Sequence, residues 1–225
     1  MAKKNTSDRF DPALKTSFNQ KFREKRFNNF LELLSKVDSG NPIKILDVGG
    51  LEVYWNSMNF IGYDHVHITL LNLEEVPTKG ANFTSMKGDA TNLSMFKDNE
   101  FDIVFSNSVI EHLYTYENQQ KMANEARRVG RYYYIQTPNY YFPFEPHWLF
   151  PFFQFFPFRL KLFLTMNFNL GHYKKITDRN LATNIVNEVK LLTEKEMNRL
   201  FPDGKLYREY FGGLVKSITM YTSPQ

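Results

Sequence analysis

Four short apolar runs and a weaker one at residues 83–87 divide the first 140 residues of the chain, and each ends in a polar or glycine-containing turn. They lie at residues 43–48, 65–73, 83–87, 101–106 and 132–136. Runs of this length, rich in β-branched and aromatic residues, are typical of buried strands. Helical or loop segments separate them, including a helix that ends near Val37. This alternation predicts βαβ units and a parallel sheet with right-handed crossovers.

The character of the chain changes after Pro138. Between positions 140 and 158, 11 of the 19 residues are aromatic, and five of the ten prolines fall between positions 138 and 157. Prolines at this density exclude a regular strand or a long helix. We therefore expect an irregular aromatic insertion over the end of the sheet. A helix capped by Thr193 and Glu196 and a strand pair near residues 205–221 are expected after it.

Length and composition exclude several classes of protein. The 225 residues fit one domain, and the net charge of +4 is scattered along the chain. The lack of cysteine excludes disulfide scaffolds, cysteine zinc sites and thiol nucleophiles, and it fits a reducing cytoplasm. Residues 2–9 are polar and basic, which predicts a frayed start rather than a signal peptide. The longest apolar stretch, residues 148–164, is broken by prolines and charges, so a cytoplasmic protein is expected.

An acidic residue and two glycines stand at the end of the first predicted strand. Asp47 lies two residues before Gly49, and Gly50 follows directly. Ligands of doubly wound sheets bind at the carboxyl ends of the strands, where glycine lets the backbone approach a ligand closely. Amide groups exposed beyond such a turn can hold the carboxylate of an amino acid such as methionine.

This segment resembles the first motif of class I S-adenosylmethionine-dependent methyltransferases, an acid followed by glycines as D-x-G-x-G. Asp47, Gly49 and Gly50 match it, whereas Leu51 replaces the second motif glycine, which predicts a shorter or differently shaped loop. Residues 101–112 are similar to the fourth motif, FDxVxxxxVxEH. Because the motifs occur in the family's order and spacing over residues 27–140, the resemblance is specific.

The resemblance implies S-adenosylmethionine as the cofactor and further residues that contact it. The family usually has an acid at the end of the second strand that binds the ribose hydroxyls, and either Asn72 or Glu74 lies there. Asp89 and Ala90 follow Gly88 as in the third motif, whose aspartate contacts the adenine amino group. Asn107, within the fourth motif, completes the expected cofactor site.

The resemblance also implies a fold. It is α/β, a doubly wound and mostly parallel seven-stranded sheet of the Rossmann-like methyltransferase type. The aromatic insertion follows the fifth strand, and an antiparallel strand pair ends the chain. We expect a single domain over residues 1–225. Its parts are an N-terminal helical region (1–40), a cofactor-binding half (41–139), the insertion as an acceptor cap (140–180), and a C-terminal helix with strands (181–225).

Three histidines are candidates for chemistry on an acceptor. Methyl transfer is an in-line displacement in which the protein aligns the acceptor and excludes water, and histidine suits removal of a hydroxyl proton. His147 lies in the insertion with Glu145 as its orienting partner. His112 follows the fourth strand, but the family's Glu111-His112 pair fits a structural role equally well. His172 is a further candidate. No two histidines have the sequence spacing of metal ligands, so no metal site is expected.

The expected acceptor is a small molecule, a glycan or a lipid-linked intermediate, since residues 136–147 resemble a bacterial subgroup of these methyltransferases. The aromatic insertion packs as core and can also line the acceptor pocket or face a membrane. The basic residues within it either meet anionic headgroups or form a solvated rim. Nucleic acid is not expected as a partner because there is no basic stripe.

The alternative function is a non-catalytic, methyltransferase-like binding or scaffold protein. A nucleotide-dependent oxidoreductase is disfavoured because no G-x-G-x-x-G follows the first strand.

Overall fold

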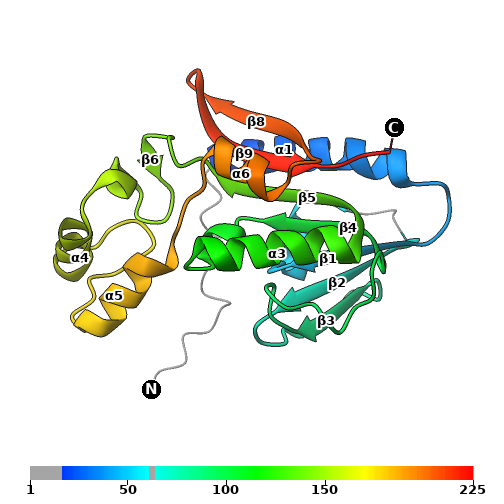
Figure 1. Ribbon diagram of the computed structural model, residues 1–225, viewed down its shortest axis with the longest axis horizontal. Helices are drawn as coiled ribbons and strands as arrows, with labels where there is room; N and C mark the ends of the chain where they lie inside the picture. The colour runs from blue at the N-terminus through cyan, green and yellow to red at the C-terminus, as the bar shows by residue number, and fades with distance from the viewer. Residues whose placement is uncertain (1–16, 61–63, 225) are drawn as a thin grey trace.

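A seven-stranded sheet crosses the centre of the computed structural model, which describes residues 17–60 and 64–224 (Figure 1). Its strand order is β3-β2-β1-β4-β5-β9-β8. The strands are β1 (Ile43–Val48), β2 (Val66–Asn72), β3 (Phe83–Lys87), β4 (Phe101–Asn107), β5 (Gly130–Pro138), β8 (Lys205–Phe211) and β9 (Leu214–Tyr221). The first five are parallel, and β9 is antiparallel to both β5 and β8. The expected fold class is confirmed.

Helices cover both faces of this sheet. α1 (Ser17–Val37) and α2 (Glu52–Ser57) pack on one face, and α3 (Tyr116–Val129) and α6 (Glu194–Leu200) pack on the other. Successive strand residues point to opposite faces. Accordingly, Ile45 belongs to the apolar cluster under α1, and Leu46 belongs to the cluster under α3. Burial on both faces explains why the inner strands are almost continuously apolar.

Side-chain caps fix the starts of two helices that pack on the sheet. The side chain of Thr115 accepts a hydrogen bond from the backbone amide of Asn118 at the start of α3. At the start of α6, Thr193 and Glu196 form both halves of a capping box. The capping box predicted from the sequence is therefore confirmed.

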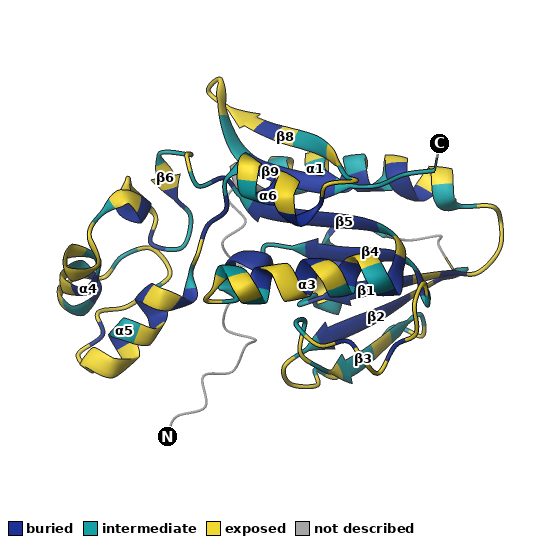
Figure 2. Cartoon of the chain, viewed as in Figure 1, coloured by how far each residue is buried: buried dark blue, intermediate teal, exposed yellow. Residues whose placement is uncertain are grey.

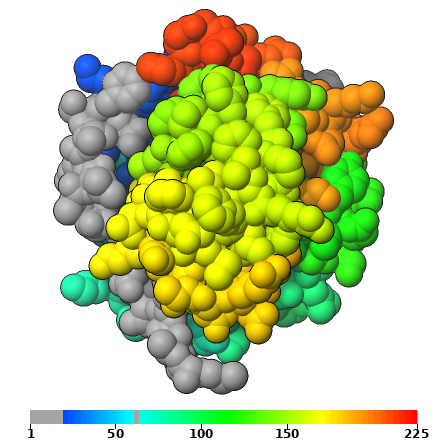
Figure 3. Space-filling view, turned by 90° about the vertical axis from the view of Figure 1, so that its left-hand side faces the viewer, coloured from blue at the N-terminus to red at the C-terminus, as the bar shows by residue number. Residues whose placement is uncertain are grey.

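The aromatic insertion forms a lobe at one end of the sheet. It contains β6 (Phe144–Glu145), β7 (Phe150–Pro151), a short 3-10 turn η3 (Phe153–Phe155) and α4 (Phe158–Asn167), and α5 (Arg179–Glu188) packs against α4. We call residues 140–188 the cap. Figure 3 looks onto the cap, which covers the centre of that face of the molecule.

The cap has an apolar cluster of its own. Trp148 stacks on Phe153 with ring centroids 4.4 Å apart, and residues of α4 and α5 pack around them. Because α5 contributes Ala182 and Val186 to this cluster, the cap extends past residue 180, the boundary expected from the sequence. The outer side of α4 is largely exposed (Figure 2).

The position of α4 follows from the distribution of proline. Within the segment expected to be irregular, the helix begins at Phe158, directly after Pro157, the last proline of the insertion. Proline is tolerated at a helix start, where its missing amide costs nothing.

The N-terminal residues 2–9, expected to be frayed, lie outside the described residues. Among the residues that the structure describes, no helix combines the length and apolarity needed to cross a membrane.

Candidate functional site

The carboxyl ends of the parallel strands all meet the edge of the sheet nearest the cap. In Figure 1 the arrowheads of β2 and β3 point toward the side on which α4 and α5 lie. Residues at the ends of β1, β2 and β4 therefore share one edge, and the cap lies beyond it. In doubly wound sheets this edge is the ligand-binding edge.

The turn after β1 is built around a buried carboxylate. Asp47 is 1% exposed, and its Oδ2 accepts a hydrogen bond of 2.7 Å from the indole Nε1 of Trp55 in α2. A Cβ at Gly50 would overlap the Asp47 carboxylate, so this position requires glycine. Gly49 has φ +77°, a left-handed backbone that also favours glycine. Asp47 therefore packs under the turn and fixes which residue can follow Gly49. Its hydrogen-bond partner Trp55 was not predicted from the sequence.

The environment of Asp47 perturbs its ionisation. Burial raises the pKa of Asp47 from its ordinary value of 3.8 to about 7, and the hydrogen bond from Trp55 offsets only part of this effect. Desolvation disfavours the charged form of a carboxyl group. Asp47 therefore titrates close to neutral pH in the folded protein.

The structure separates the two candidates for the ribose position. Asn72 is half-buried at the end of β2, and its Nδ2 donates a hydrogen bond of 2.8 Å to the carbonyl oxygen of Gly50. The side chain of Glu74 is 74% exposed and lies 3.3 Å from Lys87 Nζ. Asn72 is thus fixed to the turn after β1, whereas Glu74 extends into solvent.

The remaining expected cofactor residues lie at the ends of β3 and β4. Asp89 is exposed, and its Oδ1 accepts hydrogen bonds of 2.8 Å from both the backbone amide and the hydroxyl of Thr91. It therefore holds a turn. Ala90 is half-buried and packs against the core cluster under α3. Asn107 is half-buried at the end of β4, opposite Gln136 of β5.

A second polar cluster connects the sheet to the cap. The Nδ1 of His147 lies 2.6 Å from Glu145 Oε1, and the Nε2 of His147 lies 3.2 Å from the Nε2 of His112. Glu145 is 1% exposed, and its Oε2 accepts backbone hydrogen bonds of 2.7 Å from both His147 and Trp148. The expected pairing of Glu145 with His147 is present. The fold also places His112 next to His147.

Neighbouring segments hold the His112 side of this cluster. Glu111 and His112 belong to the short turn η2 (Ile110–His112) after β4. The Glu111 side chain is fully buried and accepts a 3.0 Å hydrogen bond from Thr137 Oγ1. Glu188, at the end of α5, lies 3.4 Å from His112 Nδ1. Sequence reasoning missed Glu188, because nothing in the chain links position 188 to position 112.

The two cap histidines have opposite electrostatic environments. Burial by itself would lower the pKa of His147, but the hydrogen bond and charge of Glu145, with the charges of Glu111 and Glu188, raise it above its ordinary value. Burial and the neighbouring His147 instead lower the pKa of His172. Of these two residues, His147 is therefore the better proton acceptor.

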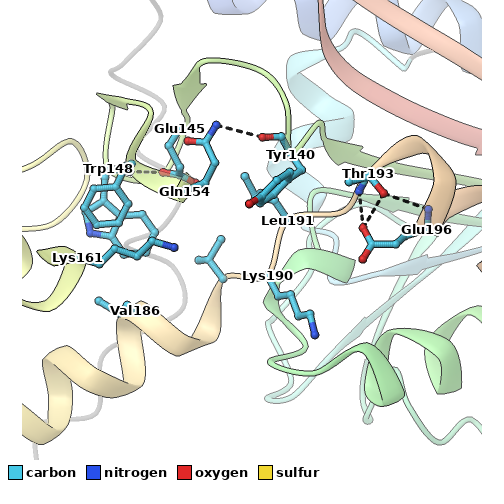
Figure 4. Close-up of a pocket in the computed structure, with 12 residues that line it drawn as sticks. Tyr140, Glu145, Trp148, Gln154, Lys161, Val186, Lys190, Leu191, Thr193 and Glu196 are labelled. Carbon is cyan, nitrogen blue, oxygen red and sulfur yellow. Dashed lines mark hydrogen bonds between the residues drawn. The ribbon is translucent and has the colours of Figure 1, made fainter. Parts of the chain in front are cut away.

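A cavity of about 390 Å³ lies between the cap and the segment that joins α5 to α6. Ligand pockets commonly enclose about 300 to 1,000 Å³. Trp148 and Val186 line it from the cap, and in Figure 4 the Lys161 amino group points from the cap toward the segment that carries Lys190. Glu145 also lines it, so the cavity adjoins the cluster that contains His147.

Comparison with known proteins agrees with this architecture. Residues 49–132 match the family model described as a methyltransferase domain. No curated protein matches the chain.

Two solved structures are similar to this chain. The first is a Burkholderia thailandensis 1,6-didemethyltoxoflavin-N1-methyltransferase with bound 1,6-didemethyltoxoflavin and S-adenosylhomocysteine. It is 12% identical, with a TM-score of 0.55, over 93% of this chain and 81% of that one. A SAM-dependent methyltransferase from Aquifex aeolicus is 15% identical, with a TM-score of 0.48, over 94% of this chain and 97% of that one. The Burkholderia structure shows that this chain has the same fold.

Proposed function

We propose that this chain is a class I methyltransferase, which transfers the methyl group of S-adenosylmethionine to an acceptor bound under the cap. The observation that carries this proposal is the turn after β1. Gly50 packs on the buried Asp47 carboxylate, and Gly49 packs against Val109. Asn72 of the neighbouring strand donates a hydrogen bond to the Gly50 carbonyl oxygen. That arrangement leaves a glycine backbone, with no side chain in the way, at the ligand-binding edge.

We assign the cofactor contacts as follows. The backbone after Gly49 and Gly50 holds the methionine part of the cofactor, with Asp47 as the positioning residue beneath it. Asn72 binds the ribose through its Oδ1, because its Nδ2 is already engaged by the Gly50 carbonyl. Asp89 and Ala90 flank the adenine, and Asn107 faces the methionine end from β4.

The acceptor is proposed to lie in the cavity between the cap and the α5–α6 segment, beside the cluster that contains His147. The cavity of about 390 Å³ suits a small molecule or the head of a larger glycan or lipid-linked substrate. Methyl transfer needs alignment more than chemical assistance. For a hydroxyl acceptor, His147 accepts the proton as the carbon–oxygen bond forms, and Glu145 orients its ring.

Exposed rings on the cap support a lipid-linked acceptor and contact with a membrane surface. The cap aromatics that are between 44% and 67% exposed are Tyr141, Phe144, Phe152, Phe155, Phe158, Phe163 and Phe168. The exposed residues Arg159, Lys174 and Lys175 lie in the same segment and suit anionic headgroups. We propose that this face rests on a membrane surface while the acceptor enters the cavity.

Calorimetric titration with S-adenosylmethionine and S-adenosylhomocysteine tests the cofactor assignment. Wild type is expected to bind both ligands, and Asn72→Ala is expected to weaken binding at least about tenfold, because a buried hydrogen bond to the ribose is lost. Glu74→Ala is the matched control and should bind as wild type does. If well-folded wild type binds neither ligand, the enzyme assignment fails and the non-catalytic scaffold becomes the better description.

Sedimentation with vesicles of anionic phospholipid tests the membrane contact. Wild type should sediment with the vesicles, and the double variant Phe163→Ser/Phe168→Ser should do so markedly less without a change in thermal stability. Leu73→Ser is the control, since Leu73 is 68% exposed but directly follows β2 and lies outside the cap. Equal sedimentation of the control and the double variant would contradict the proposed orientation.

A further inference from the structure

The two histidines of the cluster face each other through the same ring nitrogen. The Nε2 atoms of His112 and His147 are 3.2 Å apart, and the rings are almost perpendicular, at 89°. On the far side of each ring a carboxylate faces the Nδ1 atom. Glu145 Oε1 is 2.6 Å from His147 Nδ1, and Glu188 Oε1 is 3.4 Å from His112 Nδ1.

The carboxylates bias which nitrogen of each neutral ring carries the proton. Glu145 is hydrogen-bonded to His147 Nδ1, which places the ring proton of neutral His147 on that nitrogen. His112 Nδ1 has no hydrogen-bond partner, but the charge of Glu188 at 3.4 Å favours a proton on it. Each Nε2 atom then presents a lone pair to the other. Two lone pairs at 3.2 Å repel each other unless a positive species lies between them.

A third ligand atom points to a cation larger than a proton. One oxygen of Glu111 and one nitrogen of each histidine lie within 4.8 Å of one another. The Glu111 side chain is fully buried, and although its Oε2 accepts the Thr137 hydroxyl, its Oε1 has no hydrogen-bond partner. A buried carboxylate oxygen without a partner is costly, and a coordinated cation would satisfy it.

We propose that Glu111, His112 and His147 bind a divalent transition-metal ion of the zinc type. Nitrogens that bind zinc tetrahedrally at about 2.0–2.1 Å are about 3.3 Å apart, close to the 3.2 Å between the two Nε2 atoms. Two imidazoles and one carboxylate favour zinc or its neighbours over magnesium or calcium, which prefer oxygen ligands. Glu145 and Glu188 act as the carboxylates that orient metal-bound histidines.

Three protein ligands leave a fourth coordination position for water or an acceptor oxygen. A bound cation lowers the pKa of a coordinated hydroxyl, and it uses the Nε2 lone pair that His147 would need as a base. In the metal-loaded protein the cation would therefore activate the acceptor in place of His147. The coordinated hydroxyl would lose its proton to solvent water, and its oxygen would take the methyl group as the carbon–sulfur bond of the sulfonium breaks. This role rests on the proposed function, whereas the binding site itself does not.

Metal binding to the full-length protein tests the site without any assay of activity. Protein treated with a chelator is titrated with Zn²⁺ by calorimetry and with Co²⁺ by visible absorption. One equivalent of each is expected, with the intense visible bands of tetrahedral Co²⁺. His147→Gln and Glu111→Gln should lose most of the binding, and Glu188→Gln should weaken it about 10- to 100-fold. His172→Gln is the matched control and should bind as wild type does.

Two results would overturn the proposal. One is the absence of Zn²⁺ binding to folded wild type. The other is equal Zn²⁺ affinity in His147→Gln and His172→Gln, with circular dichroism verifying that both variants are folded. Titration with S-adenosylmethionine in the same samples separates the two proposals. Zn²⁺ binding without cofactor binding would refute only the proposed function, whereas cofactor binding without Zn²⁺ binding would refute only the metal site.

Discussion

Replacing Asp47 with asparagine should make the protein more stable at neutral pH, because the wild-type carboxyl group is buried under a glycine turn with one hydrogen-bond donor. Asparagine has nearly the same shape, and its Oδ1 can accept the same hydrogen bond from Trp55. It differs in having no charge to desolvate. The substitution therefore isolates the free energy of placing this carboxylate in the core.

The pKa gives the magnitude and the sign. A pKa raised from 3.8 to about 7 corresponds to about 4 kcal/mol, since one pH unit is worth about 1.4 kcal/mol. Below pH 3.8 the Asp47 carboxyl is protonated in both the folded and the unfolded states. As pH rises toward 7, only the unfolded state releases the proton, so the wild type loses stability over this window. Above pH 7 the loss is complete and constant.

Chemical denaturation of wild type and Asp47→Asn at several pH values between 4 and 8.5 measures this effect. The difference in unfolding free energy should be near zero at pH 4 and should grow to at most about 4 kcal/mol in favour of asparagine above pH 7. Near neutral pH the melting temperatures should differ by roughly 10 °C for a domain of this size. A difference that does not change with pH would refute the reasoning, because Asp47 would then not be a desolvated carboxyl group.

Three further substitutions test individual contacts. Gly50→Ala should destabilise the fold by about 1–3 kcal/mol and abolish calorimetric binding of S-adenosylmethionine, because its Cβ would overlap the Asp47 carboxylate. Wild-type affinity in this variant would contradict the assigned site. Gln119→Met should lower the free energy of unfolding in urea by about 1–3 kcal/mol. Gln119 Nε2 donates to one backbone carbonyl in η2 and to one in the α5–α6 segment, and so links the two. An unchanged free energy would mean that water replaces these hydrogen bonds. Thr193→Ala should cost about 1 kcal/mol in the same assay, and an unchanged midpoint would show that the capping box is dispensable.

The sheet could be predicted because its signals are local. A parallel strand buried on both faces must be apolar throughout, as the inner strands are. All five parallel strands, the edge strand β3 included, lie within about two residues of the predicted runs. The capping box at Thr193 and the turn at Gly49 and Gly50 are also local patterns. Each of these features depends on residues within a few positions of one another, so a single sequence contains the information.

The candidate site could be predicted only in part, because its polar groups come from distant segments. The sequence identified His112 and His147 separately, but their contact depends on how the cap folds back over η2. Glu188 reaches His112 only because α5 packs on α4 and ends near η2. The Trp55–Asp47 hydrogen bond was missed since α2 spans only six residues and has too few turns to show a helical pattern.

Buried carboxyl groups lie where the cap contacts the sheet, although apolar side chains alone could form this contact. Glu111, Glu145 and Glu188 are at most 9% exposed, so three carboxyl groups are buried in one region beside the two histidines. Buried charge of one sign is costly, and a well-packed apolar cluster would stabilise the interface better. A divalent cation would offset part of this negative charge and would join η2, at the end of β4, to His147 of the cap. The same cation would then set both the position of the acceptor and the closure of the cap over the cofactor edge.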